Sequence, residues 1–201
     1  MIAIIDYKMG NLASVQKALN NLGLVNKITQ VPQEIKEASA IILPGVGSFQ
    51  QGMKNLEELQ LTELLHEEVI VKKKPFMGIC LGMQLLMDKG SEPVNCSGLG
   101  WIKGSVNKIK NKQAPIPHLG WNQIYKSGDD KTVDTIDNNF YFIHSYHVTL
   151  EDKMDDTTFV DYEFPMVASF RKENIYATQF HPEKSQGAGL RLLKTYFTGH
   201  A

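Results

Sequence analysis

Residues 75–87 read PFMGICLGMQLLM and carry a cysteine, Cys80, between two glycines. The apolar run Phe76–Ile79 predicts a strand, and the helical pattern of Met83–Met87 follows it directly. Glycine at positions 78 and 82 lets the backbone turn sharply between strand and helix. The order of strand, potential nucleophile and helix predicts a nucleophile elbow.

This elbow would expose the Cys80 thiol at a helix N-terminus, where the thiolate is favoured over the thiol. The alternative is that Cys80 is a small buried apolar residue, the commonest fate of a free cysteine. The pentapeptide alone leaves these two interpretations about even. Cys96 has no comparable context, and we interpret it as structural.

Around the elbow, short β-branched runs alternate with helical patterns. The runs that predict strands are Met1–Ile5, Ala40–Leu43 and Phe76–Ile79. A helix is predicted over Leu12–Leu22, with Asn11 as its cap and Gly23 at its end. A second helix is predicted over Leu56–Val71, and Lys72–Lys74 would form its solvated C-terminal end. This alternation is typical of an α/β fold in which helices connect parallel strands.

After about Gly98 the pattern changes to short strand-like segments, which indicate antiparallel hairpins added to the sheet. A closing helix is predicted over Gly187–Phe197. The chain of 201 residues has the size of one α/β domain, so we expect a single domain over 1–201. The strand-like segments are Trp101–Ile109, Asn122–Lys126, Asn139–Leu150, Met166–Arg171 and Ile175–Phe180.

Composition excludes several classes of function. Lys plus Arg total 21 against 22 for Asp plus Glu, so no net positive field attracts nucleic acid or acidic membranes. The opening MIAIIDYKMGN is neither a secretory signal nor a membrane span, which predicts a cytoplasmic protein. Two cysteines without a CxxC pair argue against a disulfide framework and structural zinc. His144 and His147 would point to opposite faces of one strand, so we expect no metal site and no cofactor.

A thiol nucleophile needs a base, and His181 in the run QFHPE is the best placed histidine. In an extended segment, residues two apart share a face, so the Glu183 carboxylate would reach the His181 ring and fix its tautomer. The alternative for this motif alone is a surface His and Glu at the end of a strand. Together with the elbow, the pair predicts general base catalysis.

The run Pro44-Gly45-Val46-Gly47 follows a predicted buried strand and could supply backbone N–H groups to an oxyanion. The Leu81 N–H, just past the nucleophile, would be the second donor. The same glycines could form half of a phosphate-binding loop, but the third glycine and the Gly-Lys-Ser/Thr ending of such loops are absent.

Four motifs in order give the chain a resemblance to the class I glutamine amidotransferases over almost its whole length: PGVG (44–47), GICLGMQLL (78–86), YFIHSYH (141–147) and QFHPE (179–183). The resemblance implies a flavodoxin-like fold with a mixed, mostly parallel central sheet flanked by helices. It implies that Cys80 attacks the carboxamide of L-glutamine and forms a glutamyl thioester that water resolves. His181 and Glu183 would complete the triad.

The resemblance also assigns substrate-binding and oxyanion positions. Gly47, Gln84, Ser145 and Tyr146 would hold the glutamine, and Val46 lies in the strand that must offer its N–H. We expect glutaminase activity to stay low until a partner protein binds its own substrate and the Val46 N–H turns inward.

Closer still, DYKMGN (6–11), PHLGWN (117–122) and Lys184 are similar to the glutaminase subunits of imidazole glycerol phosphate synthases. This similarity implies docking on a (β/α)8 cyclase subunit that uses ammonia to make imidazole glycerol phosphate and an aminoimidazole carboxamide ribotide in histidine biosynthesis. Asn11, Trp121, Asn122 and Lys184 would lie near that interface. Without the similarity, Trp121 and Asn122 would be interpreted as a packed hairpin edge.

Three alternatives stay open from the residues. The same triad would serve an amidotransferase subunit that aminates sugars for surface polysaccharides, or a stand-alone hydrolase of γ-glutamyl substrates. The third is an α/β binding module that has lost its chemistry, because a fold does not imply a function. A chain of this length leaves no room for a second catalytic domain, so synthetic use of ammonia would need another chain.

Overall fold

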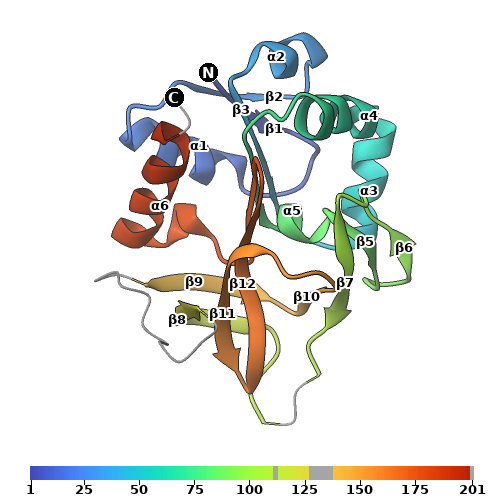
Figure 1. Cartoon of the computed structure of the whole chain (residues 1–201), viewed down its shortest axis with the longest axis vertical. Coiled ribbons are helices and arrows are strands. Elements are labelled where there is room, and N and C mark those ends of the chain that lie inside the picture. The colour runs from blue at the N-terminus through green and yellow to red at the C-terminus, as the bar shows by residue number, and fades with distance from the viewer. Residues whose placement is uncertain (111–112, 127–137, 200–201) are drawn as a thin grey trace.

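A nine-stranded mixed sheet runs through the centre of the molecule in the order β2-β1-β3-β4-β13-β12-β11-β8-β9 (Figure 1). The structure, a computed structural model, describes residues 1–110, 113–126 and 138–199. Its parallel strands are β2 (Asn26–Thr29), β1 (Ile2–Ile5), β3 (Ala40–Gly45), β4 (Phe76–Cys80) and β13 (Ile175–Thr178). The antiparallel strands are β12 (Phe164–Lys172), β11 (Asp155–Tyr162), β8 (His118–Lys126) and β9 (Asn139–His144).

A second, four-stranded sheet has the order β10-β7-β5-β6. Its strands are β10 (Tyr146–Leu150), β7 (Ile102–Lys108), β5 (Met87–Gly90) and β6 (Cys96–Ser97). The chain passes from the large sheet to the small one at Ser145, between β9 and β10. The predicted mixed sheet with added hairpins is therefore present, with parallel strands in one half and antiparallel strands in the other.

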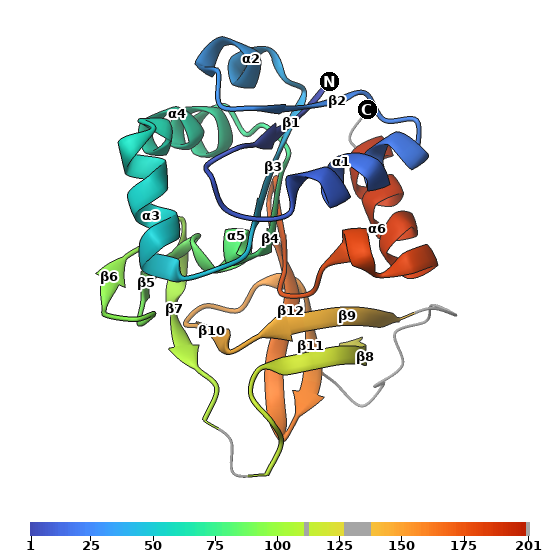
Figure 2. The ribbon, with the colours of Figure 1, turned by 180° about the vertical axis from the view of Figure 1, so that it is seen from behind.

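Helices cover both faces of the parallel half (Figures 1 and 2). One face carries α1 (Leu12–Asn21) and α6 (Gln186–Thr198), and the other carries α2 (Pro32–Glu37), α3 (Phe49–Glu58), α4 (Leu61–His66) and a π-helix (Glu67–Val71). Alternate residues of β1 point to the two faces of the sheet. Ile2 and Ile4 belong to the hydrophobic cluster that includes α1 and α6, and Ala3 and Ile5 belong to the cluster that includes α2, α3 and α4. Within the described ranges, no helix has the length and apolar character needed to cross a membrane.

The predicted strands of the first half and the helices that become α1 and α6 are confirmed, but the helix predicted over Leu56–Val71 is wrong in its bounds. α3 already begins at Phe49, because the Ser48 side chain caps it by accepting from the Gln51 N–H. Gln60 then adopts a left-handed conformation, φ 55°, and breaks the helix. The apolar spacing continues across this break, so the pattern gave no sign of it.

Two other predicted bounds are corrected. The helix predicted over Met83–Met87 is α5, Leu81–Gln84, and Met87 already begins β5. The single strand predicted over Asn139–Leu150 is two strands in different sheets. Elements that were not predicted are β2, α2, β5, β6 and β11, which are mostly short or half exposed and lack a strong apolar pattern.

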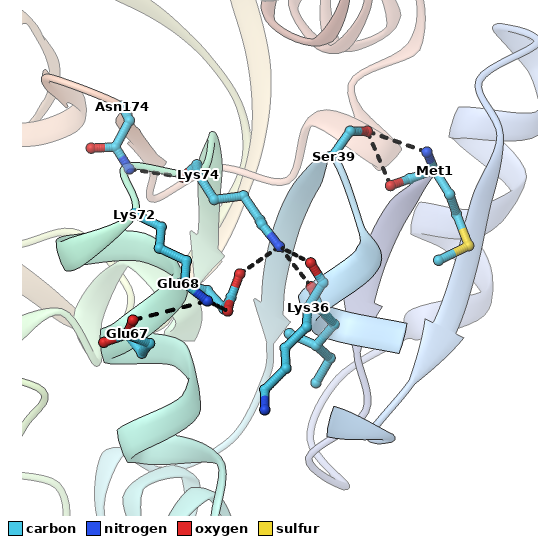
Figure 3. A network of polar contacts seen from close by, with 9 residues as sticks. Met1, Lys36, Ser39, Glu67, Glu68, Lys72, Lys74 and Asn174 are labelled. Carbon is cyan, nitrogen blue, oxygen red and sulfur yellow. Dashed lines mark hydrogen bonds and ion pairs between the residues drawn. The ribbon is translucent and has the colours of Figure 1, made fainter. Parts of the chain in front are cut away.

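A buried carboxylate ties the π-helix to α2 (Figure 3). The Glu68 side chain is 1% exposed and accepts from Lys72 Nζ and Lys74 Nζ, each at 2.6 Å. Lys74 Nζ also donates to the Ile35 and Lys36 carbonyls at 2.9 and 2.8 Å. The prediction that these lysines form a solvated helix end is wrong for Lys74, because a buried Glu68 charge requires a partner of opposite charge.

Candidate active site

Cys80 is the last residue of β4 and adopts a positive φ of 54° immediately before α5. The flanking glycines make this turn possible. A Cβ at Gly82 would lie 1.7 Å from the Leu43 carbonyl oxygen, and one at Gly78 would lie 2.9 Å from the Gly82 carbonyl oxygen. The predicted strand–turn–helix geometry is therefore present, although Cys80 is only 6% exposed and is not the openly exposed thiol that we expected.

His181 and Glu183 lie together, with 2.7 Å between His181 Nδ1 and Glu183 Oε1. The contact is made through a 3₁₀ turn, Pro182–Lys184, and not through the extended segment that we expected. Burial lowers the pKa of His181, but Cys80 and the Glu183 carboxylate together outweigh it and raise that pKa to about 10. Within the described part of the chain, His181 Nε2 and Glu183 Oε2 are buried and make no hydrogen bond.

Cys80 opens onto a pocket of about 520 Å³. A larger cavity of about 870 Å³ lies among β10, β11 and β12, but it contains none of the predicted site residues, so the smaller pocket is the candidate site. The predicted oxyanion and substrate-binding residues all line the smaller pocket: Val46, Gly47, Leu81, Gln84, Ser145 and Tyr146.

Sequence reasoning missed two residues at this site. Glu92 lines the pocket from the segment between β5 and β6, and no motif marked it. Gln179 is fully buried, and its Nε2 lies 3.6 Å from Cys80 Sγ. Gln179 belongs to the QFHPE motif, two residues before His181, and this position could have indicated that it lies near Cys80.

Two of the four predicted interface residues share one surface. Trp121 is 42% exposed on β8 and contacts the Tyr141 ring edge-on, with 5.9 Å between centroids. Lys184 Nζ lies 5.7 Å from the centroid of the same ring, and Lys184 also lines the pocket. This outward face of β8 and β9, with the exposed Leu119 and Ile143, is called here the β8–β9 face.

The other two predicted interface residues are used within the chain. Asn122 Nδ2 contacts His118 Nε2 at 2.6 Å, and because neighbours on a strand alternate, Asn122 points away from the β8–β9 face. The Asn11 side chain caps α1 by accepting from the Ser14 N–H at 3.3 Å, as predicted from the sequence.

His144 and His147 do not lie on one strand, because Ser145 separates β9 from β10. The prediction that the two side chains point to opposite faces of a single strand is therefore wrong. His144 Nδ1 contacts the Tyr146 carbonyl oxygen at 2.8 Å, so it is occupied by a hydrogen bond. Over residues 1–110, 113–126 and 138–199, no group of three His, Cys, Asp or Glu side chains could hold a metal ion.

Comparison with known proteins agrees with this architecture. The glutamine amidotransferase class-I family matches residues 3–198. The imidazole glycerol phosphate synthase subunit HisH 1 of Campylobacter jejuni is 47% identical over 199 residues, covering 98% of each chain. Subunit HisH 2 of Methanococcus maripaludis is 44% identical with the same coverage. PurLQS from Thermotoga maritima shares the fold, with a TM-score of 0.70 at 14% identity over 100% of this chain and 98% of the other. The chain belongs to the class I glutamine amidotransferase family, in the group formed by the HisH subunits of imidazole glycerol phosphate synthase.

Proposed function

We propose that this chain is the glutaminase subunit of an imidazole glycerol phosphate synthase. It hydrolyses L-glutamine to glutamate and ammonia, and the ammonia passes to a cyclase subunit that makes imidazole glycerol phosphate and an aminoimidazole carboxamide ribotide for histidine biosynthesis. The observation that carries the proposal is Cys80 at a strained elbow on the pocket, together with a His181 ring that interacts with Cys80 and lies 2.7 Å from Glu183.

In the first half-reaction, His181 accepts the Cys80 proton, and the thiolate attacks the side-chain carbonyl carbon of glutamine. The C–N bond then breaks as His181 returns the proton to the leaving nitrogen, which departs as ammonia. In the second half-reaction, His181 takes a proton from water and the hydroxide attacks the thioester carbon. The C–S bond then breaks, glutamate leaves, and His181 returns the proton to Cys80 Sγ. Glu183 stabilises the imidazolium form of His181 in both halves, which agrees with the raised pKa of His181.

The negative charge on the carbonyl oxygen needs N–H donors that are in position when the charge develops. Leu81 is the first residue of α5, so its N–H has no partner within that helix and is available to an oxyanion. The Val46 N–H is the proposed second donor, because Val46 borders the same pocket. Both donors come from the ends of neighbouring parallel strands, β3 and β4.

Glutamine carries an ammonium and a carboxylate as well as its amide, and the pocket holds side chains of both signs. Glu92 and Lys184 line it and would complement these two charges. Gly47, Gln84, Ser145 and Tyr146 would hold the remaining polar groups of the substrate.

A partner is supported by the β8–β9 face. Leu119 and Trp121 are 57% and 42% exposed beside Lys184, which borders the pocket. Exposed aromatic side chains such as Trp121 are enriched in protein interfaces. We propose that a (β/α)8 cyclase covers this face, so that ammonia leaves the pocket without entering bulk water.

We also propose that residues 1–201 form one domain and that the reaction occurs in the cytoplasm. Shared hydrophobic clusters that draw on both the first and last helices support a single domain. The free thiols of Cys80 and Cys96 suit a reducing compartment.

The test is glutamate release from glutamine by the purified chain, alone and with a histidine-pathway cyclase plus its nucleotide substrate. We expect release to rise sharply with the liganded cyclase and to disappear in Cys80→Ala. Cys80-dependent release that the cyclase does not change would contradict the partner. Preference for γ-glutamyl peptides over glutamine, without any partner, would favour the stand-alone hydrolase.

A further inference from the structure

The carbonyl oxygen of Tyr146 joins two chains of buried hydrogen bonds. Gln84 Nε2 donates to it at 3.1 Å, and His144 Nδ1 contacts it at 2.8 Å. Gln84 Nε2 also donates to Gln179 Oε1 at 3.1 Å, and Gln179 Nε2 donates to Cys80 Sγ at 3.6 Å. The Gln84, Gln179 and Cys80 side chains are 4%, 0% and 6% exposed, so water does not compete for these contacts.

A single acceptor fixes the orientation of both amides. The Tyr146 carbonyl can only accept, so Gln84 must turn its NH₂ group toward it. That same NH₂ group faces Gln179, which must therefore present its oxygen. The NH₂ group of Gln179 is then directed at Cys80 Sγ. The reversed Gln179 amide would set two NH₂ groups against each other and leave buried donors unpaired, which is costly.

The second chain holds Tyr146 from the side of β8. His144 Nδ1 must carry a proton because its partner is a carbonyl, so His144 Nε2 accepts from His118 Nδ1 at 2.9 Å. His118 Nε2 in turn accepts from Asn122 Nδ2 at 2.6 Å. Donors and acceptors match only when both histidines are neutral, and burial keeps them neutral.

We propose that Gln179 stabilises the Cys80 thiolate by donating a hydrogen bond to Sγ, and that the Tyr146 network keeps its amide in the donating orientation. The inference rests on the proposed role of Cys80 as nucleophile and adds a residue that acts directly on it. A donor at sulfur favours the thiolate over the thiol.

The experiment measures alkylation of Cys80 by iodoacetamide, which reports the thiolate without requiring glutamine hydrolysis. Cys96→Ser provides the background, so that Cys80 is the reacting thiol. Gln179→Met keeps the length of the side chain but removes the donor. Gln179→Glu keeps an oxygen for Gln84 but places a carboxylate against the sulfur. Gln30→Met, at an exposed glutamine after β2, is the matched control.

We expect alkylation at neutral pH to be about tenfold slower in Gln179→Met, since a hydrogen bond to a charged group is lost. The pH profile of the alkylation rate in Gln179→Met should move to higher pH, and alkylation of Gln179→Glu should be slower still. A purely structural role predicts the opposite order, because Glu preserves the shape of the side chain and its contact with Gln84. Gln30→Met should behave like the background protein.

Two results would overturn the proposal: alkylation in folded Gln179→Met that matches the background protein, or alkylation in Gln179→Glu that is faster than in Gln179→Met. Thermal unfolding of each variant shows that it is folded. Failure of the proposed function has a different signature: the parent chain would release no glutamate from glutamine, or Cys80→Ala would release it at the parent rate, whatever the alkylation series shows.

Discussion

The proposed nucleophile, Cys80, depends on glycines beside it, where a side chain would clash. Cys80 adopts φ 54°, a conformation that is strained for a residue with a side chain, and Gly82 lies against the backbone of β3. A Cβ at Gly82 would meet the Leu43 carbonyl oxygen at 1.7 Å, and this oxygen belongs to a central strand that cannot shift freely. The close approach of α5 to β3 therefore fixes both the elbow and the pocket.

Gly82→Ala is predicted to lower the free energy of unfolding by about 1–3 kcal/mol, the range observed for overpacked cores. Urea denaturation measures this change. Gly187→Ala is the control, because a Cβ there meets only the end of the flexible Arg191 side chain, at 3.2 Å. Equal stability of the two variants would contradict the close packing of α5 on β3.

The contact between His181 and Glu183 gives the next prediction at this scale. Glu183→Gln removes the carboxylate that lies 2.7 Å from His181 Nδ1 and should lower the pKa of His181. We expect kcat for cyclase-stimulated glutamine hydrolysis to fall about 10²-fold, the lower range for general acid–base catalysis. Steady-state kinetics over a pH series checks this. Glu151→Gln, at an exposed glutamate, should leave kcat unchanged, and an unchanged kcat in Glu183→Gln would remove Glu183 from the mechanism.

At the scale of elements, β8 and β9 meet through a pair of buried histidines. His118 and His144 are directly paired in register, and the His118 ring stacks on Phe142 and Tyr162. Burial lowers the pKa of His118 from 6.5 to about 4, and burial together with the charges of neighbouring histidines lowers that of His144 to about 3. The folded strand pair is therefore stable with both histidines neutral.

This pairing predicts a pH dependence of stability. Between pH 6.5 and about 4 the unfolded chain binds protons that folded His118 does not, so the free energy of unfolding falls as pH falls. Above pH 6.5 this contribution is fully present. His118→Asn should reduce the pH dependence of the free energy of unfolding by about 1.4 kcal/mol per pH unit in that window, the value for binding of one proton. Urea denaturation over a pH series measures both slopes, and parallel curves would show that His118 is protonated in the folded state.

The elements that the sequence predicted well are those with strong periodic or capping signals. Asn11 and the leucines after it define α1, and the glycines around Cys80 define the elbow. The turn between β9 and β10 was missed, because residues on both sides of Ser145 have strand propensity and only tertiary packing sends them to different sheets. Gln179 was missed for a related reason: which atom faces Cys80 depends on Gln84 and Tyr146, two distant partners.

For the whole molecule, the site lies where the two halves of the fold meet. The parallel strands β3 and β4 end at Gly45 and Cys80, next to Val46, and the junction of β9 and β10 supplies Ser145 and Tyr146 from the other side. Ligands commonly bind at the carboxyl ends of parallel strands. Here the antiparallel half adds an exposed apolar face next to that position, and a catalytic pocket beside such a face suits a subunit whose product is used by a partner.

The last prediction concerns that face. Trp121→Ala should weaken binding of the cyclase by about 2 kcal/mol, or roughly 30-fold in Kd, because large aromatic residues at the centre of an interface contribute most. Trp121 is 42% exposed while its ring is held edge-on by Tyr141, so little ordering is required when a partner binds. Isothermal titration calorimetry measures the change, with Val25→Ala as the control because Val25 is 73% exposed outside the β8–β9 face. If both variants bind the cyclase like the parent chain, the cyclase docks elsewhere, and ammonia would need a route that does not open beside Lys184.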